Sequence, residues 1–561
     1  MYCDKPNVNL LTSYLLAYDI RHIVVCPGSR NAILVHNFSL VPEITCHAVT
    51  DERSAAFVAL GITAATGKPA AVCVTSGSAL LNTLPAAAEA FYRHLPLLII
   101  SADRPPEWIG QQDGQTIPQQ HALNEYTVFQ GQIHEIANDA TEKWTKRLLS
   151  EALLSLHEGP VHLNVPISEP LFNFTTSCLP LARPVRLHRE HVTHPWSTAL
   201  VQRLKDARCP ILVVGQIDED FNSETFRALV ENQTILVLPE VLSQLPESYR
   251  TKVIEELNPG EFFSPDLVLH VGGTFVNKKL KLFLRQSQVD VIRLAKDKHL
   301  VDTFNHLTDV IPVDSLTALH MLNEIIAKLD TKREVTQALQ KLSAFRSIGS
   351  AYTSTLFSDL TVTQAALKQL SSATAIHMAN SSPVRNILHF IQSPTGHIYC
   401  NRGTNGIEGT LSTSVGHALV CDSPVYCFIG DLSFFYDQNA LWNTELGGNL
   451  HILLFNNGGG QIFKSLPGLT DSPAARKYIS ASHHTTARGL AESYNLVYFS
   501  ASTLDELDTV LPLWTKATFP RPTLLEVFTT PEANTIAAAQ IHQLYLSRSQ
   551  EIAENAPKVC L

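Results

Sequence analysis

The chain has 561 residues, of which 45% are hydrophobic, and its mean hydropathy is +0.04. This length and composition are typical of a well-packed, enzyme-sized protein with roughly two to four domains. The formal net charge is −10 and no run rich in Lys or Arg occurs, which argues against a nucleic-acid-binding surface.

The ten cysteines include no CxxC motif, and several lie in apolar runs typical of strands. They are therefore expected to be small buried residues in a reducing compartment. The N-terminal residues show no basic stretch followed by a long apolar core, and no run approaches the roughly 20 apolar residues that a membrane span needs. We expect a cytoplasmic protein.

The first third of the chain alternates predicted helices and strands. Strands are predicted over residues 23–26, 70–75, 97–102 and 161–165. Helices are predicted over residues 8–18, 54–66, 79–92 and 142–156. This alternation is typical of a doubly wound α/β domain, which we place at residues 1–180, followed by a proline-containing linker over 181–195.

Two further α/β blocks follow the linker. The block at 196–345 has strands predicted over 211–215, 234–238, 267–271 and 289–293, and helices over 316–329 and 331–344. The block at 346–561 has strands predicted over 375–378, 397–400, 426–429, 452–455 and 523–527. We therefore predict an α/β protein with three doubly wound parallel-sheet domains. No sequence repeat relates them, so any common architecture would be structural only.

The stretch from Gly430 to Phe463 predicts one βαβ unit. A strand ends in Gly-Asp, a helix is expected over about 437–446, and a second strand ends in Asn-Asn-Gly-Gly-Gly. Because the carboxyl ends of parallel strands share one edge of a sheet, Asp431 and Asn457 are expected to lie close together. Oxygen ligands beside a glycine-rich backbone suit Mg²⁺ and a diphosphate, although both sequences are equally common in ordinary turns.

The same stretch resembles the thiamine-diphosphate motif, which begins with Gly-Asp and ends with Asn. GDLS at 430–433 and NNGGGQIF at 456–463 are similar to the 2-succinyl-5-enolpyruvyl-6-hydroxy-3-cyclohexene-1-carboxylate (SEPHCHC) synthase branch of the thiamine-diphosphate-dependent enzymes, which belongs to menaquinone biosynthesis. The resemblance implies thiamine diphosphate as cofactor, with Mg²⁺ or Mn²⁺ held by Asp431, Asn457 and the Gly459 carbonyl. The cofactor contacts that it implies here are Gly430, Asp431, Leu432, Ser433, Asn457, Gly459, Gly460, Gln461, Ile462 and Phe463.

A second motif, Thr50-Asp51-Glu52-Arg53, precedes the predicted helix at 54–66. Acidic residues commonly complement a helix dipole at this position, and from the residues alone that explanation is equally good. The resemblance implies instead that Glu52 is catalytic, because its carboxyl would hydrogen-bond the cofactor's aminopyrimidine ring and promote loss of the thiazolium proton. It also implies cofactor contacts from Ser76, Gly77, Asn82 and Ile407.

The resemblance further implies a homodimer or homotetramer. In this family the glutamate and the diphosphate site of one active centre come from different chains, so the active sites lie at the subunit interface.

Several motifs follow predicted strands and are similar to the same synthase branch: PGSR at 27–30, TSGSALLN at 75–82, SADRPPE at 101–107, NSSPVR at 380–385 and NRGTNGIEGT at 401–410. Their arginines would suit a substrate with several carboxylates, although a single arginine of this kind is more often an ordinary surface residue. The substrate ligands that the resemblance implies are Ser29, Arg30, Arg104, Gln115, Lys278, Lys279, Ser381, Arg385 and Arg402. At Lys279 the family has Arg, which weakens that assignment.

The resemblance implies a transferase that decarboxylates 2-oxoglutarate and adds the resulting carbanion to isochorismate, giving SEPHCHC and CO₂. An acetolactate-synthase-like decarboxylase or carboligase is the alternative, although a pyruvate enzyme would not need Arg30, Arg104, Arg385 and Arg402. A non-catalytic nucleotide-binding protein on the same scaffold is a third possibility.

Other candidate sites are weaker. Residues 61–69 approach a phosphate-binding P-loop, but the glycine spacing is wrong and Pro69 stands where Ser or Thr is required. His188, His191 and His194 have regular spacing in the predicted linker but lack cysteine partners, so a metal site there is not expected. His483 and His484 carry no motif.

Overall fold

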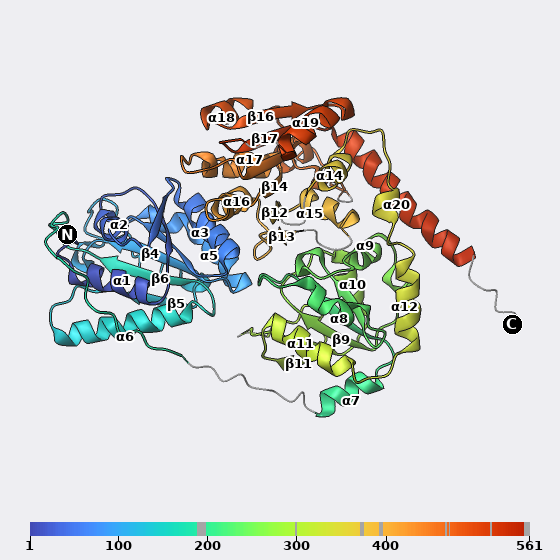
Figure 1. The fold of residues 1–561 in the computed structure, drawn as a ribbon, viewed down its shortest axis with the longest axis horizontal. Coiled ribbons are helices and arrows are strands. Elements are labelled where there is room, and N and C mark those ends of the chain that lie inside the picture. Colours follow the sequence, from blue (N-terminus) through green and yellow to red (C-terminus); the bar gives the residue numbers. More distant parts are fainter. Residues whose placement is uncertain are drawn as a thin grey trace.

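The computed structural model describes residues 1–187, 198–297, 300–370, 375–391, 396–465, 468–469, 472–516 and 519–554. Its three parallel sheets come from three successive parts of the chain, here called the N-terminal, central and C-terminal units. Figure 1 shows the blue N-terminal unit and the green central unit both meeting the orange-to-red C-terminal unit. The predicted α/β class with three doubly wound sheets is confirmed.

The N-terminal unit has a six-stranded sheet in the order β2-β1-β3-β4-β6-β5. Its strands are β1 (His22–Val25), β2 (Thr45–Ala48), β3 (Ala70–Val74), β4 (Leu97–Asp103), β5 (Phe129–Gln132) and β6 (Val161–Pro166). Its helices are α1 (Pro6–Ala17), α2 (Ala32–Ser39), α3 (Glu52–Thr66), α4 (Ser78–Asn82), α5 (Leu84–Arg93) and α6 (Asp139–Ser155). The single helix predicted over 79–92 is wrong, because the helix is interrupted at Thr83. Pro85 lies in the first turn of the new helix, where its missing N–H is tolerated.

The central unit has a five-stranded sheet in the order β11-β10-β9-β7-β8. Its strands are β7 (Pro210–Val214), β8 (Leu236–Pro239), β9 (Leu267–Val271), β10 (Val291–Leu294) and β11 (Leu307–Ile311). The helices of this region are α7 (Thr198–Asp206), α8 (Arg227–Glu231), α9 (Tyr249–Glu256), α10 (Lys278–Gln286), α11 (Ser315–Ile326), α12 (Arg333–Ser343) and α13 (Ile348–Ala351). The edge strand β11 was not predicted, because its residues are at most half-buried and lack an apolar run.

The C-terminal unit has a six-stranded sheet in the order β13-β12-β14-β15-β17-β16. Its strands are β12 (Ala375–Met378), β13 (His397–Tyr399), β14 (Val425–Gly430), β15 (Leu450–Asn456), β16 (Val497–Ala501) and β17 (Thr523–Phe528). Its helices are α14 (Asp359–Leu367), α15 (Ser382–Asn386), α16 (Thr410–Ala418), α17 (Asp431–Asp437), α18 (Arg488–Ser493), α19 (Leu504–Lys516) and α20 (Pro531–Glu554).

The helix predicted over about 437–446 is also wrong. Helix α17 begins at Asp431, directly after β14, and only a short 3-10 turn at Gln438–Leu441 continues it. Strand β14 ends at Gly430, and Asp431 is the first residue of the helix, where an acidic side chain is stabilised by the helix dipole.

The three sheets share one winding pattern. In each sheet the first strand in the sequence lies between the second and the third. These neighbours are β2-β1-β3 in the N-terminal sheet, β8-β7-β9 in the central sheet and β13-β12-β14 in the C-terminal sheet. The winding direction therefore reverses beside the first strand of each sheet. Ligands of open α/β sheets usually bind at this switch point, outside the carboxyl ends of the strands. The segments after β1, β3, β12 and β14 lie there, and they carry several of the predicted ligands, among them Arg30, Gly77, Arg385 and Asp431.

The N-terminal and C-terminal units of one chain pack tightly through α3 and α16. A Cβ atom added to Gly61 would lie 2.0 Å from the Thr413 carbonyl oxygen, and one added to Gly416 would lie 2.0 Å from the Val58 carbonyl oxygen. One hydrophobic core runs through both units, with Phe57 and Leu411 among its members. The two units therefore form one packed body.

Helix α20 leaves the C-terminal unit and packs on the central unit, where Ala537, Ile541 and Tyr545 join its core (Figure 1). Among the described residues, no helix is long and apolar enough to cross a membrane. His188, His191 and His194 lie outside the described residues. The domain limits at 180, 195 and 345, and the cytoplasmic location, stay predictions.

Candidate active site

Asp431 joins the two loops of the predicted βαβ unit. Strands β14 and β15 pair in parallel, so their carboxyl ends share one sheet edge. The buried Asp431 carboxylate accepts hydrogen bonds from the backbone N–H groups of Gly459 (2.9 Å), Asn457 (3.2 Å) and Leu432 (2.6 Å). Burial raises the pKa of Asp431 above its usual range, and the bond from Gly459 opposes that rise.

The amide of Asn457 is held in one orientation. Its Nδ2 donates to Asp359 Oδ2 at 2.9 Å, whereas its Oδ1 is buried and accepts no hydrogen bond from a described residue. Asp359 is in turn fixed by Thr529, whose hydroxyl donates to Asp359 Oδ1 at 2.5 Å. A buried acceptor without a donor costs about 1–3 kcal/mol, so Asn457 Oδ1 is suited to a ligand such as a cation.

The glycines of this loop adopt conformations that other residues disfavour. Gly458 and Gly459 have φ values of 77° and 135°. A Cβ atom on Gly459 would lie 2.6 Å from the Ser480 carbonyl oxygen, and Gly460 N–H donates to the same oxygen at 2.7 Å. The glycine run is therefore a packed loop, in which Gly459 is buried and the N–H groups of Gly459 and Gly460 are both bonded within the protein. Because glycine has no side chain, a ligand can still approach this loop closely.

His483 also lies at this site, for which the sequence offered no motif beyond the position of the His-His pair after the glycine loop. Its Nε2 is 3.3 Å from Asp431 Oδ2, and its Nδ1 accepts the N–H of Thr485 at 3.1 Å. Because Nδ1 is an acceptor, a neutral ring carries its proton on Nε2, facing the carboxylate.

Two arginines that form no ion pair with a described residue follow β12 and β13, Arg385 in helix α15 and Arg402 in the loop after β13. Arg402 is 8% exposed; its Nη1 donates to Asn380 Oδ1 at 3.0 Å, and its buried Nε has no acceptor among the described residues. Arg385 donates to the Ser381 carbonyl at 2.7 Å. Burial, and next the charge of Arg402, lower the pKa of Arg385. No described carboxylate forms an ion pair with either arginine, so this place favours an anion.

Neighbouring groups support this pocket. Ser381, at the start of α15, has φ +76° and ψ −127°, a conformation that normally requires glycine. Such strain is typical of functional sites. The hydroxyl of Ser433 donates to the Ile407 carbonyl, and the Ile407 side chain is 44% exposed.

The N-terminal unit carries the other predicted half. Asp51, not Glu52, caps α3, because its Oδ1 accepts the N–H of Arg53 at 2.9 Å. The Glu52 carboxylate is left to accept from Asn82 Nδ2 at 3.0 Å. Asp51 therefore caps the helix, and Glu52, in the first turn of α3, is also paired with another predicted cofactor contact.

Other predicted ligands of this unit lie in the neighbouring loops. Gly77, next to Ser76, has φ +86°, and a Cβ there would lie 3.2 Å from the Gln115 backbone. Arg30 pairs with Glu169 at 3.0 Å and donates to the Ile167 carbonyl, and Arg104 pairs with Asp113 at 3.0 Å. Ser29 is exposed in the loop after β1.

The lysines of the central unit are less well placed. Both Lys278 and Lys279 are exposed, and Lys279 Nζ donates to the Glu256 carbonyl at 3.0 Å. No hydrogen bond or ion pair between described residues joins them to Arg385 or Arg402.

The two predicted halves remain separate within one chain. No hydrogen bond or ion pair between described residues joins Glu52, Arg30 or Arg104 to the predicted ligands of the C-terminal unit. The residues flanking Glu52 do reach that unit: Asn439 Nδ2 donates to Asp51 at 2.8 Å, and Arg53 donates to the Tyr436 carbonyl at 2.7 Å.

Comparisons with known proteins identify the family. Residues 8–126 match the family model described as "Thiamine pyrophosphate enzyme, N-terminal TPP binding domain". SEPHCHC synthase of Phocaeicola vulgatus is 39% identical to this chain, over 95% of this chain and 97% of its own length. The chain belongs to the SEPHCHC synthase family. The synthase of Bacteroides thetaiotaomicron is 39% identical over 94% of this chain and 96% of its own, and that of Flavobacterium johnsoniae is 35% identical over 95% and 98%.

This member of the SEPHCHC synthase family is a thiamine-diphosphate-dependent enzyme, thiamine pyrophosphate being the same compound. The residues after β14 and β15 fit that cofactor. Asn457 Oδ1 is an unused buried acceptor, Asp431 is a buried carboxylate, and the glycines of the loop place no side chain between the backbone and a diphosphate. Among the described residues no group of three His, Cys, Asp or Glu side chains could hold a metal, as expected where one carboxylate and substrate phosphates suffice.

The individual ligand roles in this enzyme stay predictions, but the fold gathers the C-terminal set around Asp431 and Arg402. Sequence reasoning missed three residues of this region, His483, Asp359 and Glu89. The His-His pair after the glycine loop was a weak signal for the first. A lone acidic residue in the apolar stretch of α5 was a usable signal for Glu89, whose contacts are described below. Nothing in the sequence pointed to Asp359.

Proposed function

We propose that this enzyme decarboxylates 2-oxoglutarate and adds the resulting carbanion to isochorismate, giving SEPHCHC and CO₂ in menaquinone biosynthesis. The observation that supports it best is the pair Arg385, which is half-buried, and Arg402, which is buried, two cations that form no ion pair with a described carboxylate. Both substrates carry carboxylates, and arginine binds carboxylates in a bidentate way. The near full-length relatives bear the name of this synthase.

The metal we propose is Mg²⁺ or Mn²⁺, held by the Asp431 carboxylate, Asn457 Oδ1 and the Gly459 carbonyl. The unused Asn457 Oδ1 supports this assignment. When bound, thiamine diphosphate supplies the electron sink for decarboxylation and the nucleophilic carbon. The protein's part is to hold the diphosphate on residues 458–460, to support the cofactor with Ile407, and to exchange a proton with its ring nitrogen through Glu52.

The complete site is proposed to form between two chains of a homodimer or homotetramer. The separation of the Glu52 group from the Asp431 group within one chain supports this. Exposed apolar side chains near the C-terminal half-site also support a covering partner: Ile407 is 44%, Tyr436 is 50% and Trp442 is 59% exposed. Residues 1–180, 196–345 and 346–561 are the proposed domains, with 181–195 as linker.

A pyruvate-specific carboligase is the alternative reaction, because it could use the same cofactor site. The purified enzyme with thiamine diphosphate and Mg²⁺ should release CO₂ from 2-oxoglutarate and form SEPHCHC when isochorismate is present, and pyruvate should not replace 2-oxoglutarate. Turnover of pyruvate alone at a comparable rate would reject the proposed reaction.

A further inference from the structure

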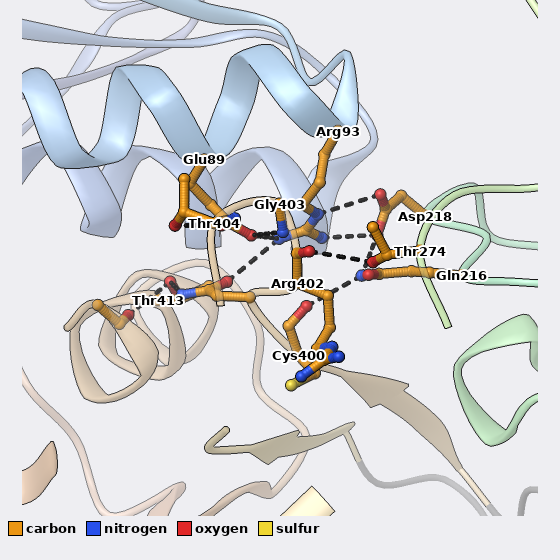
Figure 2. Close-up of polar contacts among 12 residues, drawn as sticks. Glu89, Arg93, Gln216, Asp218, Thr274, Cys400, Arg402, Gly403, Thr404 and Thr413 are labelled. Carbon is orange, nitrogen blue, oxygen red and sulfur yellow. Dashed lines mark hydrogen bonds and ion pairs between the residues drawn. The ribbon is translucent and has the colours of Figure 1, made fainter. Parts of the chain in front are cut away.

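Glu89 and Arg93 of the N-terminal unit form an ionic cluster with Asp218 of the central unit. A loop of the C-terminal unit meets them there. Figure 2 shows Glu89 and Arg93 on a helix of the N-terminal unit, facing Asp218 of the central unit and a loop of the C-terminal unit. Arg93 donates to both oxygens of Asp218, at 3.1 and 2.6 Å, and its Nη1 lies 3.3 Å from Glu89 Oε1. Glu89 is fully buried.

The Glu89 carboxylate holds the backbone of the loop that carries Arg402. Its Oε1 accepts the N–H of Gly403 at 2.9 Å, and its Oε2 accepts the N–H of Thr404 at 2.8 Å and the Thr404 hydroxyl at 3.1 Å. A side chain on Gly403 would not fit, because its Cβ would lie 2.6 Å from the Glu89 carbonyl oxygen. Hydrogen bonds to a buried carboxylate are among the stronger ones in proteins.

The central unit holds the same loop from another side. Gln216 Nε2 donates to the Cys400 carbonyl at 2.9 Å, and the Thr274 hydroxyl donates to the Arg402 carbonyl at 3.0 Å. Arg93 also donates to Asn401 Oδ1 at 3.1 Å. Each residue from 400 to 404 is therefore fixed by a contact to another part of the protein.

None of these contacts to the loop uses the guanidinium group of Arg402. In Figure 2 it points away from Glu89 and Arg93, and its buried Nε has no acceptor among the described residues. Loops are usually mobile, and a binding group gains affinity when its backbone is fixed beforehand.

We propose that Glu89 is a positioning residue that fixes the Arg402 loop in its substrate-binding conformation, so that the N-terminal unit shapes the substrate pocket of its own chain's C-terminal unit. This inference rests on the proposed role of Arg402 as a substrate ligand. The same N-terminal unit would then serve two sites: its Glu52 in the partner's active centre, and its Glu89 in the active centre built on its own chain.

The test is a double-mutant cycle of Glu89→Gln and Arg402→Ala. Glutamine keeps the shape of Glu89 but loses its charge and one of its two acceptor oxygens. Glu89→Gln should raise KM for 2-oxoglutarate or isochorismate at least fivefold, with a smaller change in kcat. In the Arg402→Ala background the same substitution should change KM less than twofold, because the group that Glu89 positions is gone.

Two further variants separate positioning from general destabilisation. Thr274→Val removes one bond to the loop from the central unit and should raise the same KM, even if Glu89→Gln folds poorly. Glu445→Gln weakens a different contact between the N-terminal and C-terminal units, to His47 and the Ala48 N–H, and should leave KM unchanged. Calorimetric affinity for thiamine diphosphate with Mg²⁺ should stay within twofold for every variant.

The proposal is overturned if Glu89→Gln raises KM equally with and without Arg402, or if Glu89→Gln and Thr274→Val both leave KM unchanged. An Arg402→Ala variant with normal KM for both substrates would also overturn it. Failure of the proposed reaction is a different result, since the wild-type enzyme would then form no SEPHCHC.

Discussion

Asp359 should control metal affinity without touching the metal. The carboxylate accepts a hydrogen bond from Asn457 Nδ2 at 2.9 Å and so fixes the orientation of the amide. The amide oxygen, Asn457 Oδ1, then has no donor among the described residues and is available to the proposed cation. In Asp359→Ala the amide can rotate, and its NH₂ group can face the cation instead. A hydrogen bond to a charged partner is worth about 1.5–3 kcal/mol. Without it, part of the free energy of metal binding is spent on orienting the Asn457 amide.

Every 1.4 kcal/mol changes a dissociation constant about tenfold, so the expected loss of Mg²⁺ affinity is about 10-fold to 100-fold. Asp359→Asn keeps an oxygen that can accept from Asn457, so its loss should be smaller. The measurement is a calorimetric titration with Mg²⁺ at saturating thiamine diphosphate. Thr363→Val is the matched control, because the Thr363 hydroxyl donates to the Asp359 backbone carbonyl and not to its carboxylate or to Asn457.

The order of Mg²⁺ affinity should be wild type, then Asp359→Asn, then Asp359→Ala, with Thr363→Val close to wild type. A folded Asp359→Ala protein that binds Mg²⁺ within twofold of wild type would refute the reasoning. Thermal unfolding without metal checks that the variant is folded.

Three further predictions concern stability. Burial lowers the pKa of His162 to about 3, so below about pH 6.5 the unfolded chain takes up a proton that the folded chain does not. At pH 5 this difference should lower the free energy of unfolding by about 2 kcal/mol, and His162→Gln should flatten the acid side of a pH–stability curve. Gly61→Ala should cost about 1–3 kcal/mol in denaturant unfolding because its Cβ meets the Thr413 carbonyl, whereas Gly489→Ala, with open space around it, should not destabilise; equal effects would contradict the close packing of α3 on α16. Ser381→Gly should raise the unfolding free energy by about 1 kcal/mol by relieving its backbone strain while raising KM, and a drop in stability would argue against strain at this residue.

Much of the fold was predictable because apolar runs mark the central strands. Strand β9, for example, has the predicted bounds, since Leu267–Val271 is buried throughout. Edge strands such as β2 and β11 were missed because their residues alternate with exposed ones and resemble loops. The start of α17 was missed because Asp431 was interpreted as part of a loop, although a helix can begin directly at a strand end.

The site was predictable where chemistry and spacing coincide along the chain. Asp431 and Asn457 follow adjacent parallel strands, and the structure brings them within one hydrogen bond. Asp359 and Glu89 act across the fold on residues far away in the sequence. No local pattern reveals Asp359, and the lone acidic residue in α5 marks Glu89 without revealing the loop that it contacts. Their roles depend on which units pack together, which only the tertiary structure specifies.

The most direct test of the shared active site mixes two inactive variants, Glu52→Gln and Asp431→Asn, and measures SEPHCHC formation from 2-oxoglutarate and isochorismate. Each variant alone should lose most activity, by about 100-fold or more, because proton exchange or metal binding fails. After subunit exchange, half of the dimers contain one chain of each kind and one intact site, so about a quarter of wild-type activity should return. No recovery in demonstrably mixed dimers would contradict an active site in which Glu52 of one chain serves Asp431 and Asn457 of another.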